Sequence, residues 1–131
     1  MARATAMILA AGRGERLRPL TDSMPKPLVE VAGKPLVVRQ IGALARAGHR
    51  DVAINASWLA QQLVDALGDG HAFGVRLHWS IEPEPLETAG GIATARPLLA
   101  DGPVLIVGAA GPVESTVKVL VVVVEFPARS T

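Results

Sequence analysis

Three observations predict an α/β fold: a Rossmann-like, three-layer α/β/α domain with a mostly parallel sheet. Short apolar strands alternate with helical patterns along residues 5–107, an order typical of βαβ units. The 131 residues suit one domain, and half of them are apolar with a mean hydropathy of +0.36, so a buried core is expected. A loop rich in glycine and arginine follows the first strand, where such sheets bind ligands.

Each element is predicted from local pattern. Apolar residues at Val37, Ile41 and Leu44 recur at helical spacing after Pro35, and Gly48 ends that pattern. In chain order, the predicted strands are Thr5–Leu9, Asp51–Asn55, Val75–Ile81 and Pro103–Val107, and the predicted helices are 35–48, Ser57–Leu67 and Thr88–Leu99, the last bent or broken at Pro97. The alternation predicts helices on both faces of the sheet.

Composition excludes several classes of protein. The chain has no cysteine, so disulfides, thiolate metal sites and cysteine nucleophiles are excluded. The longest apolar run, Val119–Val124, is too short to cross a bilayer, and Met7–Ala11 is too short for a secretory signal. We therefore expect a cytoplasmic protein with no membrane partner.

Charge is distributed unevenly along the chain. Residues 1–50 carry nine Lys/Arg and three Asp/Glu, whereas residues 51–131 carry four and nine. The basic first segment predicts an anionic ligand near the N-terminus. Aromatic residues make up 3% of the chain and tyrosine is absent, which leaves few platforms for stacking bases, so we expect no nucleic-acid partner. A small phosphorylated ligand fits this pattern better.

The loop after the first strand has the composition of a phosphate site. Gly12 and Gly14 allow backbone N–H groups to approach a phosphate, and Arg13, Arg16 and Arg18 add three cations that suit phosphate oxygens. A plain turn with solvated arginines is the alternative. The position of the loop directly after a strand favours the phosphate site.

Lys26 is a second candidate phosphate ligand. It lies within Pro25-Lys26-Pro27, and the prolines are expected to hold it on a stiff, extended segment. Two better-known phosphate loops do not fit. Leu17 replaces the third glycine of a dinucleotide fingerprint, and Pro35 follows Gly33-Lys34 where a P-loop has Ser or Thr.

Several motifs together resemble a known family, the nucleotidyltransferases that join a nucleoside triphosphate to a sugar 1-phosphate. The resemblance covers about residues 5–107, and its motifs are Leu9–Thr21, Pro25–Leu28, Gly33–Leu36, Asn55–Leu59 and Pro85–Gly91. It implies the Rossmann-like fold of nucleotide-diphospho-sugar transferases, in-line attack of the sugar phosphate on the α-phosphorus, and release of pyrophosphate.

The subtype depends on a shorter stretch. Leu86-Glu87-Thr88 before the glycines is most similar to the N-acetylmuramate 1-phosphate uridylyltransferases of bacterial cell-wall recycling. This implies UTP and N-acetylmuramate 1-phosphate as substrates. A mannose-1-phosphate guanylyltransferase is the alternative within the family. An oligomeric state is not implied.

The resemblance also implies roles for matching residues. Arg16 and Lys26 would be catalytic, because they would neutralise charge on the phosphates during transfer. The implied nucleotide-binding residues are Ala11, Gly12, Gly14, Glu15, Glu82, Thr88 and Gly90. Mg²⁺ is the cofactor that this chemistry implies.

The chain departs from the family after the fourth strand. The family has Asn-Gly-Asp there, with the Asp as a magnesium ligand, but the chain has Gly108 and Ala110 at the Asn and Asp positions, so we predict no metal ligand at Ala110. Residues 1–107 are interpreted as the N-terminal part of the transferase domain. Residues 108–131 are interpreted as an atypical tail, which a frameshift would explain. An inactive nucleotide-binding remnant and a regulatory module therefore remain alternatives.

Three further predictions concern individual segments. Glu84 and Glu87 are expected to be solvated loop acids, as is Glu82 unless it contacts base or ribose. Asn55 either caps the helix predicted from Ser57 or contributes to the site. The valine-rich run 117–124 is a strand candidate that would either fill the sheet edge or promote self-association.

Overall fold

The central sheet has five strands in the order β5-β4-β1-β6-β7. The structure is a computed structural model and describes residues 2–12, 18–113 and 116–129. Strands β1 (Ala6–Leu9), β4 (Asp51–Ala56), β5 (Arg76–Ile81) and β6 (Gly102–Val113) are parallel, and β7 (Thr116–Phe126) is antiparallel to β6. The predicted mostly parallel α/β fold is confirmed.

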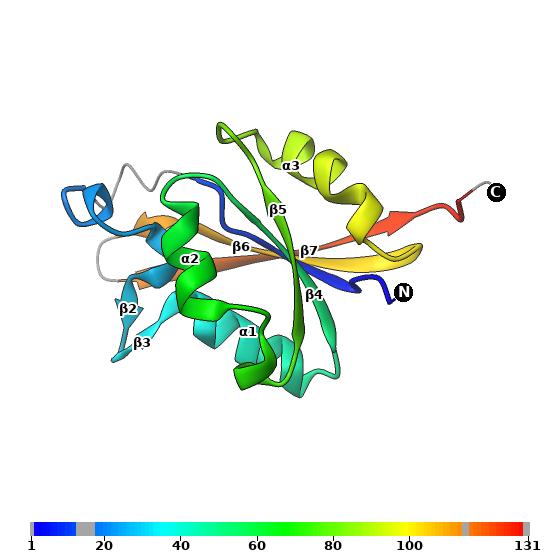
Figure 1. The fold of residues 1–131 in the computed structure, drawn as a ribbon, viewed down its shortest axis with the longest axis horizontal. Coiled ribbons are helices and arrows are strands. Elements are labelled where there is room, and N and C mark those ends of the chain that lie inside the picture. The colour runs from blue at the N-terminus through cyan, green and yellow to red at the C-terminus, as the bar shows by residue number, and fades with distance from the viewer. Residues whose placement is uncertain (1, 13–17, 114–115, 130–131) are drawn as a thin grey trace.

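Helices cover both faces of the sheet, as predicted. Figure 1 shows α1 (Leu36–Arg46) and α2 (Ala60–Leu67) on one face and α3 (Thr88–Ala95) on the other. Strand alternation divides the core accordingly. Ile8 and Ile54 are fully buried in the cluster that contains the α1 and α2 residues, whereas Met7 and Ala53 are fully buried in the cluster that contains the α3 residues.

The predicted helices are confirmed, with two adjustments. The second helix begins at Ala60 rather than Ser57, because Leu59 has a left-handed backbone (φ +54°) that a helix cannot include. The third helix ends at Ala95 and passes into a 3-10 turn, η5 (Arg96–Leu98), so the break expected at Pro97 is confirmed. Other 3-10 turns are η2 (Leu20–Asp22), η3 (Lys26–Leu28) and η4 (His71–Phe73).

A small hairpin was missing from the sequence prediction. β2 (Glu30–Val31) and β3 (Lys34–Pro35) pair antiparallel through a two-residue turn. Both turn residues have positive φ, +52° at Ala32 and +82° at Gly33, which is the requirement of a type I′ turn. Alanine is uncommon in the first of these positions, which explains why the sequence pattern did not indicate a hairpin.

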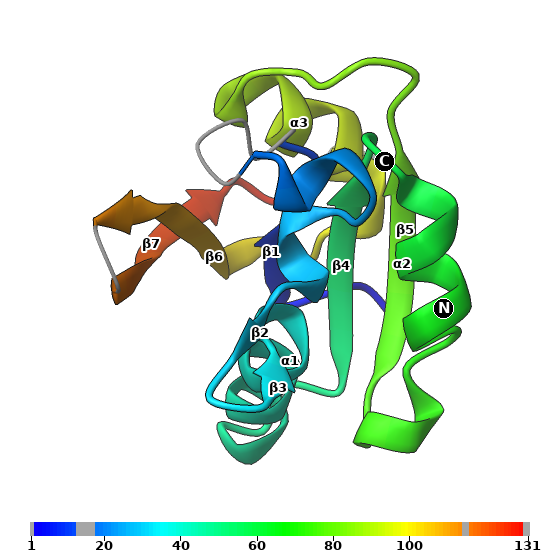
Figure 2. The ribbon, with the colours of Figure 1, turned by 90° about the vertical axis from the view of Figure 1, so that its left-hand side faces the viewer.

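The fourth strand is longer than predicted, because β6 and β7 form a hairpin that runs past the end of β1. The strand candidate at 117–124 is confirmed as part of β7, and register pairs such as Leu105 with Val123 fill the edge of β6. Figure 2 shows part of this hairpin extending away from both helical layers. Val121, Val122 and Val123 lie on β7, the last strand in the described sheet order, and are 55%, 44% and 62% exposed.

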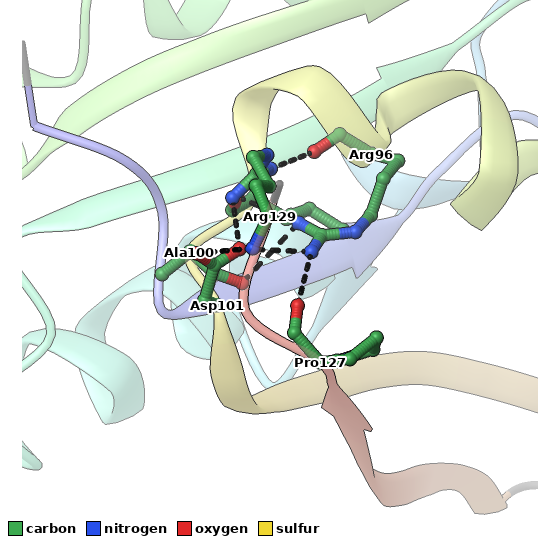
Figure 3. Close-up of polar contacts among 6 residues, drawn as sticks. Arg96, Ala100, Asp101, Pro127 and Arg129 are labelled. Atoms are coloured by element: carbon green, nitrogen blue, oxygen red, sulfur yellow. Dashed lines mark hydrogen bonds and ion pairs between the residues drawn. The ribbon is translucent and has the colours of Figure 1, made fainter. Parts of the chain in front are cut away.

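The last described residues are attached to the end of η5 by a small ionic cluster (Figure 3). Arg129 donates to the Asp101 carboxylate and to the carbonyl oxygen of Arg96 at 2.6 Å. Arg96 in turn donates to Asp101 at 2.9 Å, and its guanidinium lies 4.3 Å from the centroid of the Phe126 ring. Within the part of the chain that the structure describes, no helix has the length and hydrophobicity needed to span a membrane.

Candidate nucleotide site

A hollow of about 280 Å³ lies at the carboxyl ends of the parallel strands. Three strands contribute residues to its lining: Leu9 at the end of β1, Asn55 near the end of β4, and Gly108 of β6. The remaining lining residues are Ala10, Ala11, Gly12, Lys26, Pro27, Leu36, Gln40, Leu86, Glu87 and Thr88. Ligands of open α/β sheets bind at this edge. The hollow therefore lies at the edge of the sheet where the sequence predicts a site.

Four of the predicted site residues are brought together there. Ala11 and Gly12 follow β1, Lys26 begins η3, and Thr88 begins α3, and all four line the hollow. Gly12 has open space where a Cβ would point, so the glycine is not required by packing against the described residues. An open backbone at a strand end is accessible to a phosphate.

The other predicted residues are placed differently. Gly14, Glu15 and Arg16 lie outside the described residues. Gly90 is not among the lining residues, and a Cβ there would lie 3.3 Å from Cβ of Leu86, so its small size serves the packing of Leu86 against α3. Glu82 is also absent from the lining.

Lys26 is held by a turn and not by the extended segment that the sequence predicted. Pro25 is extended (φ −70°, ψ 148°), but Lys26 begins η3, and the N–H of Val29 donates to the Lys26 carbonyl oxygen at 3.0 Å. The N–H of Leu36 then donates to the Val29 carbonyl oxygen at 3.0 Å, which joins this segment to the start of α1. The turn positions Lys26 at the hollow.

Asn55, which lines the hollow, forms a buried pair with Glu82, which does not. Asn55 Oδ1 accepts a hydrogen bond from the Ala10 N–H at 2.6 Å, and Asn55 Nδ2 donates to Glu82 Oε2 at 3.1 Å. Glu82 Oε1 accepts from the N–H of Leu86 at 3.1 Å. Asn55 is 3% and Glu82 2% exposed, so the expectation that Glu82 is a solvated acid is wrong, and Asn55 does not cap a helix.

Helix α3 approaches this pair through Gly91. A Cβ at Gly91 would lie 2.8 Å from Asn55 Nδ2 and 3.2 Å from Glu82 Oε2, distances too short for a larger side chain. The first turn of α3, which carries Thr88, is thereby held against the ends of β4 and β5. The hydrogen bonds and this close approach fix the relative positions of the loop after β1, the end of β4 and the first turn of α3.

The described residues do not offer a magnesium site of the expected kind. No group of three or more His, Asp or Glu side chains among them is arranged to hold a metal ion. Both carboxylate oxygens of Glu82 already accept hydrogen bonds from protein groups. Glu87 is the one carboxylate on the described lining, and Gly108 supplies no side-chain ligand.

Sequence reasoning missed Gln40, Leu36 and Leu86 as lining residues. Glu87 is exposed, as expected of a solvated acid, but it also lines the hollow, which the sequence did not indicate. One signal was available for Gln40. It is a polar residue at a position of α1 where helical spacing predicts burial, next to Val37 and Ile41.

A parallel α/β sheet with a glycine-containing loop and a lysine at its strand ends is an arrangement typical of nucleotide-binding α/β domains. The chain belongs to the nucleotidyl transferase family, whose sequence profile matches residues 5–118. It is 59% identical over 103 residues to an N-acetylmuramate alpha-1-phosphate uridylyltransferase of Neisseria meningitidis, covering 78% of this chain and 45% of that protein. It is 48% identical over 99 residues to the mannose-1-phosphate guanylyltransferase catalytic subunit beta of Drosophila pseudoobscura, covering 75% and 27%.

The fold is shared with a solved protein structure. A Bacillus anthracis protein assigned as a glucose-1-phosphate thymidylyltransferase superposes with a TM-score of 0.74 at 23% identity, covering 79% of this chain and 43% of that one. The chain thus spans less than half the length of the relatives that it matches.

Proposed function

We propose that the chain is the nucleotide-binding part of a sugar-1-phosphate nucleotidyltransferase, with UTP as the nucleotide and N-acetylmuramate 1-phosphate as the acceptor. The observation that carries the proposal is the hollow at the strand ends, which Gly12 and Lys26 line together. The choice of substrates is supported by the 59% identity to the uridylyltransferase of Neisseria meningitidis. The identity to the mannose-1-phosphate guanylyltransferase is lower and gives that alternative no better support.

The described residues suit the binding of a triphosphate. The backbone at Gly12 is open for phosphate oxygens, and the Lys26 ammonium supplies the positive charge that they require. Arg16, outside the described residues, is proposed to add a second cation. In the reaction, an oxygen of the sugar phosphate forms a bond to the α-phosphorus, the bond from that phosphorus to the oxygen bridging to the β-phosphate breaks, and pyrophosphate leaves with its charge balanced by Lys26.

The proposal distinguishes binding of UTP from catalysis of the transfer reaction. The described carboxylates do not form the metal site that the family implies, so no step is assigned to Mg²⁺ here. Binding of UTP with no release of pyrophosphate would support the nucleotide-binding remnant that the replacement of the family Asp by Ala110 predicts.

Calorimetric titration of UTP and GTP into the purified chain, with and without Mg²⁺, tests binding. A parallel assay measures pyrophosphate released from UTP when N-acetylmuramate 1-phosphate is added. Saturable binding of UTP that is tighter than that of GTP supports the proposal, and pyrophosphate release extends it to the reaction. A folded chain that binds neither nucleotide contradicts the proposal.

A further inference from the structure

Gln40 is the polar member of the buried face of α1. The buried residues of this helix are Leu36, Val37, Gln40, Ile41 and Leu44. Gln40 is 7% exposed, yet it lines the hollow at the strand ends. A glutamine at such a position costs side-chain entropy and desolvation that an apolar residue would avoid, so its amide calls for a physical explanation.

The amide of Gln40 has no hydrogen-bond partner among the described residues, and the residue lines the hollow. Over the same described ranges, every fully buried side-chain nitrogen or oxygen has a hydrogen-bond partner. The amide nitrogen and oxygen of Gln40 are therefore not fully buried, and the hollow is the space that the residue lines.

The chemistry of the amide indicates which part of a nucleotide it would contact. A phosphate offers oxygen acceptors and carries negative charge, and its complement is a cation such as Lys26, which lines the same hollow. An amide is neutral, and it presents two donors and an acceptor side by side. Its complement is a neutral group with a donor next to an acceptor, such as the N–H and carbonyl edge of a uracil ring.

We propose that the Gln40 side chain hydrogen-bonds the base of the bound nucleotide and contributes to selecting a uracil base. This inference rests on the proposed function, because it requires a nucleotide in the hollow. When a uracil base binds, the Gln40 amide replaces its hydrogen bonds to water with hydrogen bonds to the base. Another base would leave a donor or the acceptor of the amide unpaired. Specificity arises from that difference in affinity.

The test compares Gln40→Met with Gln61→Met in the full chain. Methionine keeps the unbranched shape of glutamine but cannot hydrogen-bond strongly. Gln61 is exposed on α2 and bonds Asp65 at 2.8 Å, so it is a matched control away from the hollow. Calorimetry measures the affinities of UTP, GTP and tripolyphosphate, and urea unfolding shows that each variant is folded. Gln40→Leu repeats the test if Gln40→Met does not fold.

We expect Gln40→Met to weaken UTP binding about 5- to 100-fold, the range that one lost buried hydrogen bond implies. Tripolyphosphate affinity should be unchanged, and the ratio of UTP to GTP affinity should fall. Equal losses for UTP and GTP would place the amide on the ribose and overturn the inference. Equal losses for UTP and tripolyphosphate, or no loss, would also overturn it. A wild-type chain that binds no UTP would contradict the proposed function itself.

Discussion

The side-chain nitrogen of Asn55 donates a hydrogen bond to the carboxylate of Glu82 over 3.1 Å, and both residues are almost completely buried. The pair connects the carboxyl end of β4 to the segment that follows β5. Because Asn55 also accepts the Ala10 N–H at 2.6 Å, it links the loop after β1 to the same network. The buried Glu82 carboxylate thus accepts hydrogen bonds from one side-chain amide and one backbone N–H. These bonds connect the segments that follow β1, β4 and β5.

Asn55→Ala is expected to destabilise the fold. The substitution leaves the Ala10 N–H and one oxygen of the buried Glu82 carboxylate without their partner, which costs about 1–3 kcal/mol. Urea unfolding measures the loss of stability as a lower urea concentration at the midpoint of unfolding. Gln61→Ala, which removes an exposed hydrogen bond, should shift the midpoint far less. Equal midpoints for the two variants would show that the pair is not a structural element.

Lys26→Ala is expected to weaken UTP binding about 10- to 100-fold, because a charge-assisted hydrogen bond to phosphate contributes about 1.5–3 kcal/mol. Lys34→Ala is the matched control, since Lys34 is an exposed lysine on β3 outside the lining of the hollow. Calorimetry with UTP compares the two. A similar loss in both variants would mean that the effect is one of net charge rather than of position.

The sequence was sufficient to predict the edge of the sheet at which the hollow lies, but not the contacts that support the hollow. Asn55 was predicted at the end of a strand, and Glu82 follows the end of the next, so both could be assigned to one edge of the sheet. Their contact additionally requires that β4 and β5 be neighbours in register, with Ala56 opposite Ile81. The order of parallel strands is a tertiary property that local patterns do not contain, and for that reason Glu82 was interpreted as solvated.

Gln40 and the β2–β3 hairpin were missed for different reasons. At Gln40 the spacing of apolar residues predicts the helix, but it does not indicate what a polar residue on the apolar face contacts. At the hairpin, the turn contains Ala32 at φ +52°, a conformation that alanine adopts only when its surroundings impose it. Arg39 on α1 donates to the carbonyl oxygens of Val31 and Ala32 at 2.8 and 2.9 Å, so a contact from a later element supports the turn.

Asp51 is expected to make the stability of the fold sensitive to acid. Two hydrogen bonds from Arg76, at 2.9 and 2.8 Å, hold the pKa of this carboxyl below its usual 3.8, against the opposing effect of burial, and His78 Nε2 at 2.9 Å acts in the same direction as Arg76. A carboxyl with a depressed pKa in the folded state contributes stability above its unfolded pKa. That contribution is lost as the pH falls below 3.8 and then through the lower pKa that Asp51 has in the folded protein.

The measurement is urea unfolding of the wild type and Asp51→Asn from about pH 6 down to about pH 3. We expect Asp51→Asn to be less stable at the upper end of this range. The difference should shrink as the pH falls, because the wild-type carboxyl then becomes protonated and loses its attraction to Arg76. Asp65→Asn, at an exposed position on α2, provides the comparison for a general change of charge. A difference for Asp51→Asn that stays constant with pH would contradict the assignment to this ion pair.

Arg129→Ala is expected to release the end of the chain from η5. The variant loses the hydrogen bonds to the carbonyl oxygens of Arg96 and Leu99 and the ion pair with Asp101. Because the cluster is partly exposed, we expect the free energy of unfolding to fall by about 1 kcal/mol. Hydrogen exchange should accelerate at the end of β7, near Phe126, more than in β1. Arg50→Ala, at an exposed position, should leave the exchange of β7 unchanged. Unaltered protection of β7 in Arg129→Ala would show that the cluster does not hold the tail.

Strand β7 is the feature of this fold most prone to self-association. It is the last strand in the described sheet order, so its outer edge has no neighbouring strand there, and Val123 on it is 62% exposed. An apolar, exposed edge strand can pair with another chain, and natural proteins prevent this with lysine. Val123→Lys should therefore lower light scattering at high protein concentration several-fold, while stability changes by only about 0.5 kcal/mol, as for most exposed positions. Val123→Ile keeps the apolar surface and should scatter as the wild type does. If Val123→Lys and Val123→Ile scatter equally, association involves another surface; if only the lysine variant stays dispersed, the edge of β7 is the contact.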